Sequence, residues 1–148
     1  MHNIGDISVW EIVFKQFIAE NDGMEKLMLM RTFTAIKDTS ILEQFIVTAT
    51  DEKYVRAQDF LSCLIAISEN PVGTSLVWEW VRSNWEFLVD RYTLNDLHLG
   101  SLIPSITKTF ATVTRLDEME CFFLWSKFLL ELKILRTNKC ISGKLYGR

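Results

Sequence analysis

Hydrophobic side chains recur along most of this 148-residue chain with the spacing of amphipathic helices. The first stripe follows an i, i+3, i+4, i+7, i+8 pattern and consists of Trp10, Val13, Phe14, Phe17 and Ile18. Asp6 is its predicted N-cap. Comparable stripes predict further helices over residues 24–36, 40–49, 57–68, 75–92, 101–110 and 114–135. No segment alternates in the manner of a strand, so the chain is predicted to be all-α with about seven helices.

Start and stop signals support several of these boundaries. Ser40 and Glu43 have the spacing of a capping box, in which each side chain satisfies a backbone N–H at the helix start. The Asn70-Pro71 pair is predicted to end the fourth helix, because proline pushes the residue before it out of the helical region. Pro104 is expected in the first turn of the sixth helix. Beyond Leu135 the polar chain is expected to fray.

The predicted helix over residues 75–92 carries apolar residues on two faces. Trp78, Val81 and Trp85 belong to one face, whereas Trp80 and Phe87 lie seven residues apart on another. A helix that is buried on two sides is typical of the inner layer of stacked antiparallel helix pairs. The preferred architecture is therefore an α-solenoid of the HEAT or armadillo kind, and a closed helical bundle is the alternative.

Composition and charge narrow the class of protein. Hydrophobic residues make up 49% of the chain and charged residues 24%, which is typical of a folded domain. A net charge of −3 argues against nucleic acid as the main partner. Residues 127–148 nevertheless carry six basic and one acidic side chain, against 10 and 18 in residues 1–126. A solvated basic end is the preferred interpretation, and an anionic partner is the alternative.

Familiar catalytic and metal-binding motifs are missing from the sequence. The two histidines, His2 and His98, do not form H-E-x-x-H, and no nucleophile elbow or phosphate-binding glycine loop occurs. The three cysteines form no C-x-x-C pair. The acidic run 117–120 is interpreted as a helix N-terminus, and the five tryptophans as core residues rather than a ligand cage. No catalytic residue and no metal ligand is therefore predicted.

The sequence also lacks the patterns of membrane insertion and secretion. No run of about 18 uncharged apolar residues is present, because Lys127, Glu131 and Lys133 interrupt the most apolar segment. The first residues do not have the order of a signal peptide. The chain alone is therefore expected to be soluble or peripheral.

The segment from Asn70 to Leu88 nevertheless has a recognisable order. It contains Asn-Pro-x-Gly at residues 70–73, then Trp78, then Asn84-Trp85, and it follows a Val-Arg-Ala-Gln-Asp element at residues 55–59. With Trp10 and the Arg-Tyr-Thr-Leu-Asn element at residues 91–95, this pattern resembles the C-terminal helical domain of the M1 family of zinc aminopeptidases. That domain is also found in the endoplasmic-reticulum aminopeptidases, and the likeness is greatest to glutamyl aminopeptidase and aminopeptidase N. The resemblance covers residues 4–123 and leaves 124–148 as a divergent basic extension.

The resemblance implies a part of an enzyme. In these metalloproteases another domain holds the zinc, H-E-x-x-H and G-x-M-E-N, while the helical domain walls the cavity, helps to hold the far end of the peptide and opens or closes. This chain carries no such zinc site and is expected to be inactive as a hydrolase alone. Its implied partners are peptides and an aminopeptidase catalytic domain, and family members are mostly plasma-membrane ectoenzymes or secretory-pathway proteins. The alternatives are a separate interaction module, which binds peptides or a full-length aminopeptidase, and a fragment without function.

One residue is predicted to contact substrate. Arg56 is the cation of the matched element at residues 55–59, where it is placed to meet a peptide carboxylate. A structural ion pair with Asp59 is the alternative. Where glutamyl-type members are expected to carry an arginine, this chain reads Asp96-Leu97-His98, so a preference for acidic substrates is not carried over.

Overall fold

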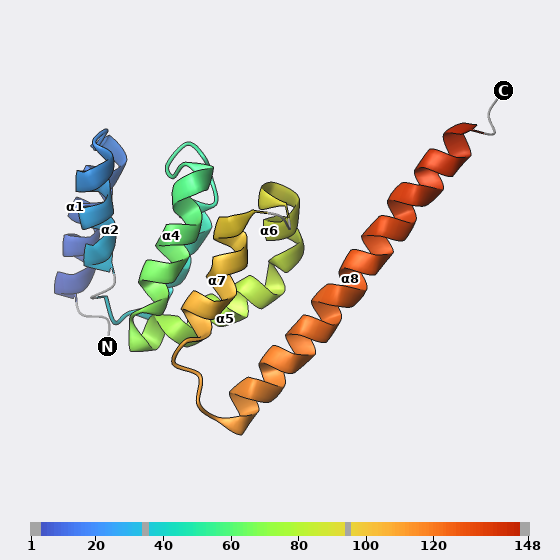
Figure 1. The fold of residues 1–148 in the computed structure, drawn as a ribbon. Coiled ribbons are helices and arrows are strands. Elements are labelled where there is room, and N and C mark those ends of the chain that lie inside the picture. The colour runs from blue at the N-terminus through green and yellow to red at the C-terminus, as the bar shows by residue number, and fades with distance from the viewer. Residues whose placement is uncertain (1–3, 34–35, 94–95, 146–148) are drawn as a thin grey trace. The chain divides into compact units, whose positions relative to one another are not determined.

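The structure is a computed structural model that describes residues 4–33, 36–93 and 96–145. Within these residues the chain forms eight helices and no strand, which confirms the all-α prediction (Figure 1). The helices are α1 (Ile4–Ala19), α2 (Gly23–Phe33), α3 (Thr39–Ala49), α4 (Ala57–Ser68), α5 (Pro71–Ser83), α6 (Trp85–Tyr92), α7 (Leu97–Thr107) and α8 (Val113–Leu145).

The chain divides into two compact units, and the boundary along the sequence lies between Lys108 and Thr109. In the first unit α4 is the central helix and packs against α2, α3, α5 and α7. Figure 1 shows α1 and α2 side by side, with α4 next to α2. The predicted stacking of helix pairs stays a prediction.

The core of the first unit is built from the stripes that the sequence predicts. Its largest fully buried side chains include Phe17, Phe45, Phe60, Trp78 and Leu88. Cys63 is also completely buried, and burial raises the pKa of its thiol to about 12. Cys63 therefore packs as a small apolar residue of the core.

The long helix predicted over residues 75–92 begins earlier, at Pro71, and it is divided into two helices at Asn84. Asn84 leaves the helical conformation with φ −116° and ψ 20°, and its amide Nδ2 donates to the carbonyl of Trp80 at 2.8 Å. The apolar stripe continues across the break through Val81 and Trp85. Periodicity alone therefore did not reveal that α5 and α6 are separate.

Other helix boundaries also differ from the prediction. The N-cap of α3 is Asp38, whose carboxylate accepts from the N–H of Ser40 at 2.9 Å. The helix α7 begins at Leu97, so Pro104 lies in its interior rather than in its first turn. The helix α1 begins at Ile4, which places Asp6 within the helix instead of at its cap. The helix predicted over residues 114–135 is longer in the structure, because α8 runs from Val113 to Leu145.

The second unit contains α8. The N–H of Arg115 donates to the hydroxyl of Thr112 at 3.3 Å, and the Arg115 guanidinium pairs with Glu118 at 2.8 Å. The same guanidinium lies 5.1 Å from the ring centroid of Phe110. Many apolar side chains of α8 are exposed, and they include Leu116, Phe123, Leu124, Trp125, Phe128, Leu132 and Ile134. Among the described residues, no helix has both the length and the apolar character needed to cross a bilayer.

Candidate functional site

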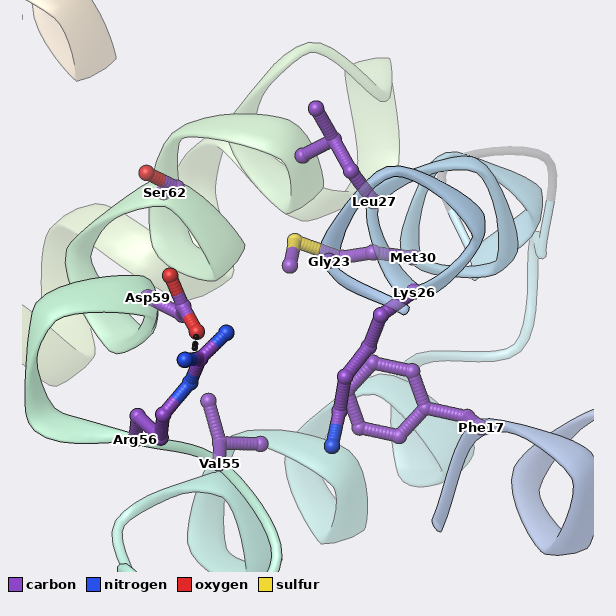
Figure 2. A pocket seen from close by; sticks show the side chains of 9 residues that line it. All are labelled: Phe17, Gly23, Lys26, Leu27, Met30, Val55, Arg56, Asp59 and Ser62. Atoms are coloured by element: carbon purple, nitrogen blue, oxygen red, sulfur yellow. Dashed lines mark hydrogen bonds and ion pairs between the residues drawn. The ribbon is translucent and has the colours of Figure 1, made fainter. Parts of the chain in front are cut away.

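A pocket of about 200 Å³ lies between α2 and the start of α4, with one wall from the end of α1 (Figure 2). Its apolar surface comes from Phe17, Leu27, Met30 and Val55. The lining is completed by Gly23, Lys26, Arg56, Asp59 and Ser62. The pocket thus combines an apolar wall with charged groups, which is the usual composition of a small ligand site.

The charged groups of the pocket favour an anion. The Arg56 Nε lies 3.0 Å from the Asp59 carboxylate, with side chains that are 61% and 34% exposed. Lys26 adds a second cation, and its Nζ lies 4.9 Å from the ring centroid of Phe17. Two cations and one carboxylate leave the lining with an excess of one positive charge. An incoming carboxylate would meet charge-assisted hydrogen-bond donors here.

Local structure explains why Arg56 borders this pocket. Val55 is buried and anchors the turn before α4, while Arg56 occupies the N-cap position in an extended conformation. Its side chain makes no capping hydrogen bond and instead reaches Asp59, three residues later. The ion pair considered from the sequence is therefore present. It does not decide the substrate role of Arg56, which stays a prediction.

The sequence did not identify Lys26 and Phe17 as neighbours of Arg56. They lie on α2 and α1, about 30 and 40 residues earlier in the chain. No motif spacing connects such distant residues, and the packing of α1 on α2 and of α2 on α4 brings them together. The pocket is therefore a property of the tertiary structure.

The Asn-Pro-x-Gly segment forms the corner between α4 and α5. The Asn70 side-chain oxygen accepts from the N–H of Val72 at 3.1 Å, and its Nδ2 donates to the carbonyl of Ile36. At Gly73, an added Cβ would lie 2.1 Å from the carbonyl oxygen of Ile67. The hydroxyl of Thr74 donates to the carbonyl of Ser68 at 2.7 Å. These contacts give the segment a structural role at the helix crossing.

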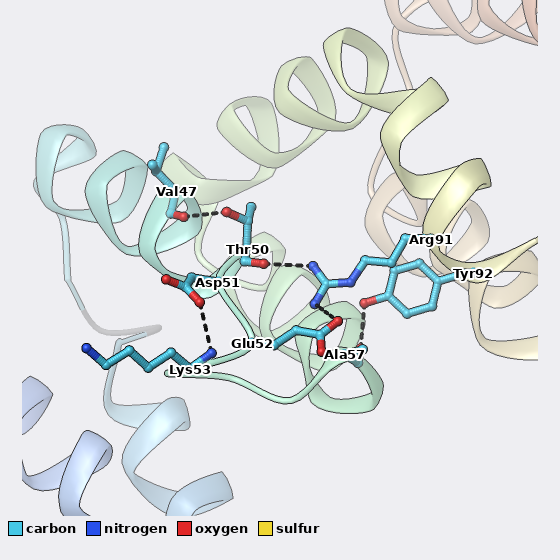
Figure 3. A network of polar contacts seen from close by, with 8 residues as sticks. All are labelled: Val47, Thr50, Asp51, Glu52, Lys53, Ala57, Arg91 and Tyr92. Atoms are coloured by element: carbon cyan, nitrogen blue, oxygen red, sulfur yellow. Dashed lines mark hydrogen bonds and ion pairs between the residues drawn. The ribbon is translucent and has the colours of Figure 1, made fainter.

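A second matched element, Arg91-Tyr92, joins the end of α6 to the connection between α3 and α4 (Figure 3). The Arg91 guanidinium donates to the carbonyl of Thr50 at 2.8 Å and to Glu52 at 3.1 Å. The hydroxyl of Tyr92 donates to the carbonyl of Ala57. Thr93 follows with φ 63°, a conformation that β-branched residues rarely adopt. Leu94 and Asn95, the last residues of this element, lie outside the described residues.

The raised pKa of Tyr92 predicts that the contribution of this residue to stability falls at high pH. Burial raises the pKa of Tyr92 from 10 to about 12 in the folded protein. Between these values the unfolded chain loses the phenolic proton first, so the contribution of Tyr92 is complete below pH 10 and is lost as the pH rises toward 12. At pH 8 we expect Tyr92→Phe to lower the free energy of unfolding by about 1 kcal/mol, the net worth of one hydrogen bond.

Urea denaturation of both proteins at pH 8, 10 and 11.5 measures this effect. The stability advantage of the wild type over Tyr92→Phe should shrink as the pH rises. Cys63 titrates in the same range but is common to both proteins, so it cancels from the difference. An advantage that stays constant up to pH 11.5 would contradict the raised pKa.

The remaining polar candidates also have structural explanations. The N–H groups of Leu99 and His98 donate to the Asp96 carboxylate at the start of α7 and lower the pKa of Asp96. The imidazole Nδ1 of His98 lies 3.4 Å from Asp96, and its side chain is 81% exposed. His2 lies outside the described residues. Among the residues that were described, no three His, Cys, Asp or Glu side chains gather as a metal site would require.

The four tryptophans of the first unit are all at least half-buried. Trp78 and Trp85 are buried, and Trp10 and Trp80 are half-buried. Trp125 on α8 differs, since 44% of it is exposed. The core interpretation therefore agrees with the first unit and is wrong for Trp125.

Comparison with known proteins gives the same family that the sequence elements resemble. Residues 1–134 match the family described as the ERAP1-like C-terminal domain. The chain is 39% identical over 123 residues to an aminopeptidase A of Gloydius brevicauda and 38% identical over 123 residues to a glutamyl aminopeptidase of Bitis rhinoceros. Each alignment covers 83% of this chain and 13% of the relative.

An aminopeptidase N of Mus musculus is 31% identical over 113 residues, which cover 76% of this chain and 12% of that protein. The chain therefore spans about an eighth of the length of these relatives. The family match includes the pocket, the α4–α5 corner and the Arg91-Tyr92 element within one continuous range. On this evidence the chain belongs to the ERAP1-like C-terminal domain family.

Proposed function

We propose that this chain acts as the C-terminal helical domain of a zinc aminopeptidase, where it walls the peptide cavity, contacts the far end of the peptide and takes part in gating. The observation that carries the proposal is the family match over residues 1–134. The names of the relatives, glutamyl aminopeptidase and aminopeptidase N, support the same activity class. The zinc and the catalytic groups belong to a separate domain, and the chain alone does not hydrolyse peptides.

The pocket between α2 and α4 supports a role in peptide binding. Arg56 and Lys26 supply donors for a carboxylate, and Met30 and Val55 supply an apolar wall for an adjoining side chain. A peptide end offers both kinds of group within one residue. The pocket is therefore chemically suited to the end of a peptide that lies far from the scissile bond.

Two measurements test this function. The purified chain with added zinc should show no turnover of aminoacyl anilides, and steady turnover that scales with protein and is abolished by a chelator would contradict the proposal. Residues 4–123, grafted in place of the corresponding domain of a homologous glutamyl aminopeptidase, should support cleavage of anilides and of longer peptides. A folded graft that cleaves anilides but no peptide of any length would also contradict it.

Arg56 predicts a specific kinetic effect in that graft. Because the guanidinium is partly exposed, its contact with a carboxylate should contribute about 1 kcal/mol. We expect Arg56→Ala to raise KM for peptides of several residues about threefold to tenfold and to leave kcat for short anilides unchanged. Steady-state kinetics over a series of peptide lengths measures the effect.

Asp59 supplies the matched test. Asp59→Asn removes the carboxylate that competes for Arg56, so it should lower KM for the same long peptides. Lys37→Ala, which removes an exposed cation that does not line the pocket, should change neither parameter. If Arg56→Ala and Asp59→Asn move KM in the same direction, Arg56 has only a structural role.

A second function rests on a different observation. Val9 and Ile12 of α1 and Met24 and Met28 of α2 are all more than half exposed. Such apolar surface is typical of a binding site for another protein. A separate interaction module would bind a full-length aminopeptidase through it. Sedimentation of the chain with purified glutamyl aminopeptidase tests this, and independent sedimentation of the two proteins would exclude it.

A further inference from the structure

Residues 50–56, which we call the α3–α4 connection, lead from the end of α3 to the pocket of Figure 2. The N–H groups of Tyr54 and Val55 both donate to the carbonyl of Asp51, at 3.0 and 3.2 Å. Val55 is buried and lines the pocket together with Arg56, the residue that follows it. The α3–α4 connection is therefore a compact turn whose last residues supply part of the pocket lining.

Both ends of the α3–α4 connection are hydrogen-bonded to the last two residues of α6 (Figure 3). At the start, Arg91 donates to the carbonyl of Thr50 at 2.8 Å and to the Glu52 carboxylate at 3.1 Å. At the end, the hydroxyl of Tyr92 donates to the carbonyl of Ala57, the first residue of α4. Two adjacent residues of α6 therefore hold the turn from both sides.

The Arg91 side chain is itself enclosed, since only 11% of it is exposed. Its guanidinium lies 5.6 Å from the ring centroid of Phe60, which is fully buried in α4. The N–H of Phe60 donates to the carbonyl of Arg56 at 3.1 Å. Thr93, the next residue after the pair, has a strained φ of 63°, and such strain persists only where the surrounding contacts outweigh it. Arg91 and Tyr92 thus form a firm attachment for the turn that begins at Arg56.

The Arg56 guanidinium, in contrast, has little packing of its own. The side chain is mostly exposed and makes no capping hydrogen bond, and its ion pair with Asp59 is partly exposed as well. The position of this cation therefore depends on where the backbone at the start of α4 is held. A displacement of about 1 Å is enough to weaken a charge-assisted hydrogen bond to a ligand.

We propose that Arg91 and Tyr92 are positioning residues of the pocket, which hold the α3–α4 connection so that Arg56 meets the carboxylate of a bound peptide. The inference rests on the proposed function of the pocket and adds to it two residues outside the pocket lining. In a purely structural role, the same contacts would stabilise the fold without changing the affinity of the pocket. The two roles are distinguishable, because a positioning residue acts through Arg56.

Titration of the full chain with N-acetyl-leucine, followed by nuclear magnetic resonance, tests the proposal. This probe has one carboxylate and one apolar side chain, and N-acetyl-leucinamide, which lacks the carboxylate, is the negative control. Arg91→Met should raise Kd for the probe about threefold, and Tyr92→Phe should raise it about twofold. Arg56→Ala should raise Kd about threefold to tenfold, and adding Arg91→Met to Arg56→Ala should have no further effect.

Lys108→Met is the matched control for the loss of charge. Lys108 lies 3.8 Å from Glu69, the C-cap residue at the other end of α4, so the substitution removes one cation and one ion pair but leaves the α3–α4 connection intact. It should leave Kd unchanged, and circular dichroism should show unchanged helix content in every variant. If Arg91→Met does not fold, Tyr92→Phe replaces it in each comparison, because it removes one hydroxyl and no charge.

An unchanged Kd in Arg91→Met and Tyr92→Phe would overturn the proposal. Effects that add to that of Arg56→Ala would also overturn it, since the residues would then act independently, and so would an equal effect of Lys108→Met. Equal affinity for the acid and the amide, or no binding of the acid to the wild type, would instead contradict the proposed function of the pocket, and the positioning role would fail with it.

Discussion

Replacing Gly73 by alanine is expected to lower the free energy of unfolding by about 3 kcal/mol. The new Cβ would lie 2.1 Å from the carbonyl oxygen of Ile67 and 2.9 Å from a side-chain carbon of that residue. The nearest obstacle is backbone, so α5 must move away from the end of α4. Because α4 and α5 form the centre of the first unit, that movement loosens contacts on both sides.

Urea denaturation followed by circular dichroism measures this loss, and Gly100→Ala is the control. Gly100 also lies within a helix, α7, but an added Cβ there meets nothing within 4 Å. Alanine is the better helix former, so Gly100→Ala should raise stability by about 0.5 to 1 kcal/mol. If both variants shift stability in the same direction, the effect of Gly73→Ala comes from helix propensity and not from the close approach to Ile67.

Asn70→Ala is expected to lower the free energy of unfolding by about 2 to 4 kcal/mol. The substitution removes the N-cap acceptor of α5, which contributes about 1 kcal/mol. It also removes the donor to the Ile36 carbonyl from a residue that is only 5% exposed. An acceptor left without its partner in such a position costs a further 1 to 3 kcal/mol or so.

Asn70→Ser separates the two contributions, because serine caps a helix well but is too short to replace the Nδ2 donor. Its unfolding free energy should lie between those of the wild type and Asn70→Ala. A serine variant as stable as the wild type would show that the bond to Ile36 contributes nothing. A serine variant no more stable than Asn70→Ala would show that the N-cap contributes nothing to stability.

Sequence patterns predicted the helical class and most of the core, because burial of one helix face leaves a periodic trace in the order of residues. They did not reveal the break at Asn84, since the apolar stripe runs through it without interruption. Helix starts were also misplaced where several residues were suitable caps. Asp38 caps α3 two residues before the predicted Ser40. Asp96 caps α7, so this helix begins at Leu97, four residues before the predicted start at residue 101.

The candidate site was predicted only in part. The pairing of Arg56 with Asp59 follows from a separation of three residues near a helix start, so it is a local property. The contribution of Lys26 depends on how α2 packs against α4, and nothing in the local sequence encodes that approach. Resemblance to a family pointed to Arg56, but the other side chains of the pocket became visible only in the fold.

Burial of Cys63 has a consequence for the redox behaviour of the first unit. With a thiol pKa of about 12, on the order of one Cys63 side chain in ten thousand or fewer is a thiolate near neutral pH. Disulfide exchange proceeds through the thiolate, so this sulfur is slow to form mixed disulfides even with a strong oxidant present. The folded first unit can therefore keep a free cysteine at its centre in oxidising surroundings, where the exposed thiol of Cys121 is open to oxidation.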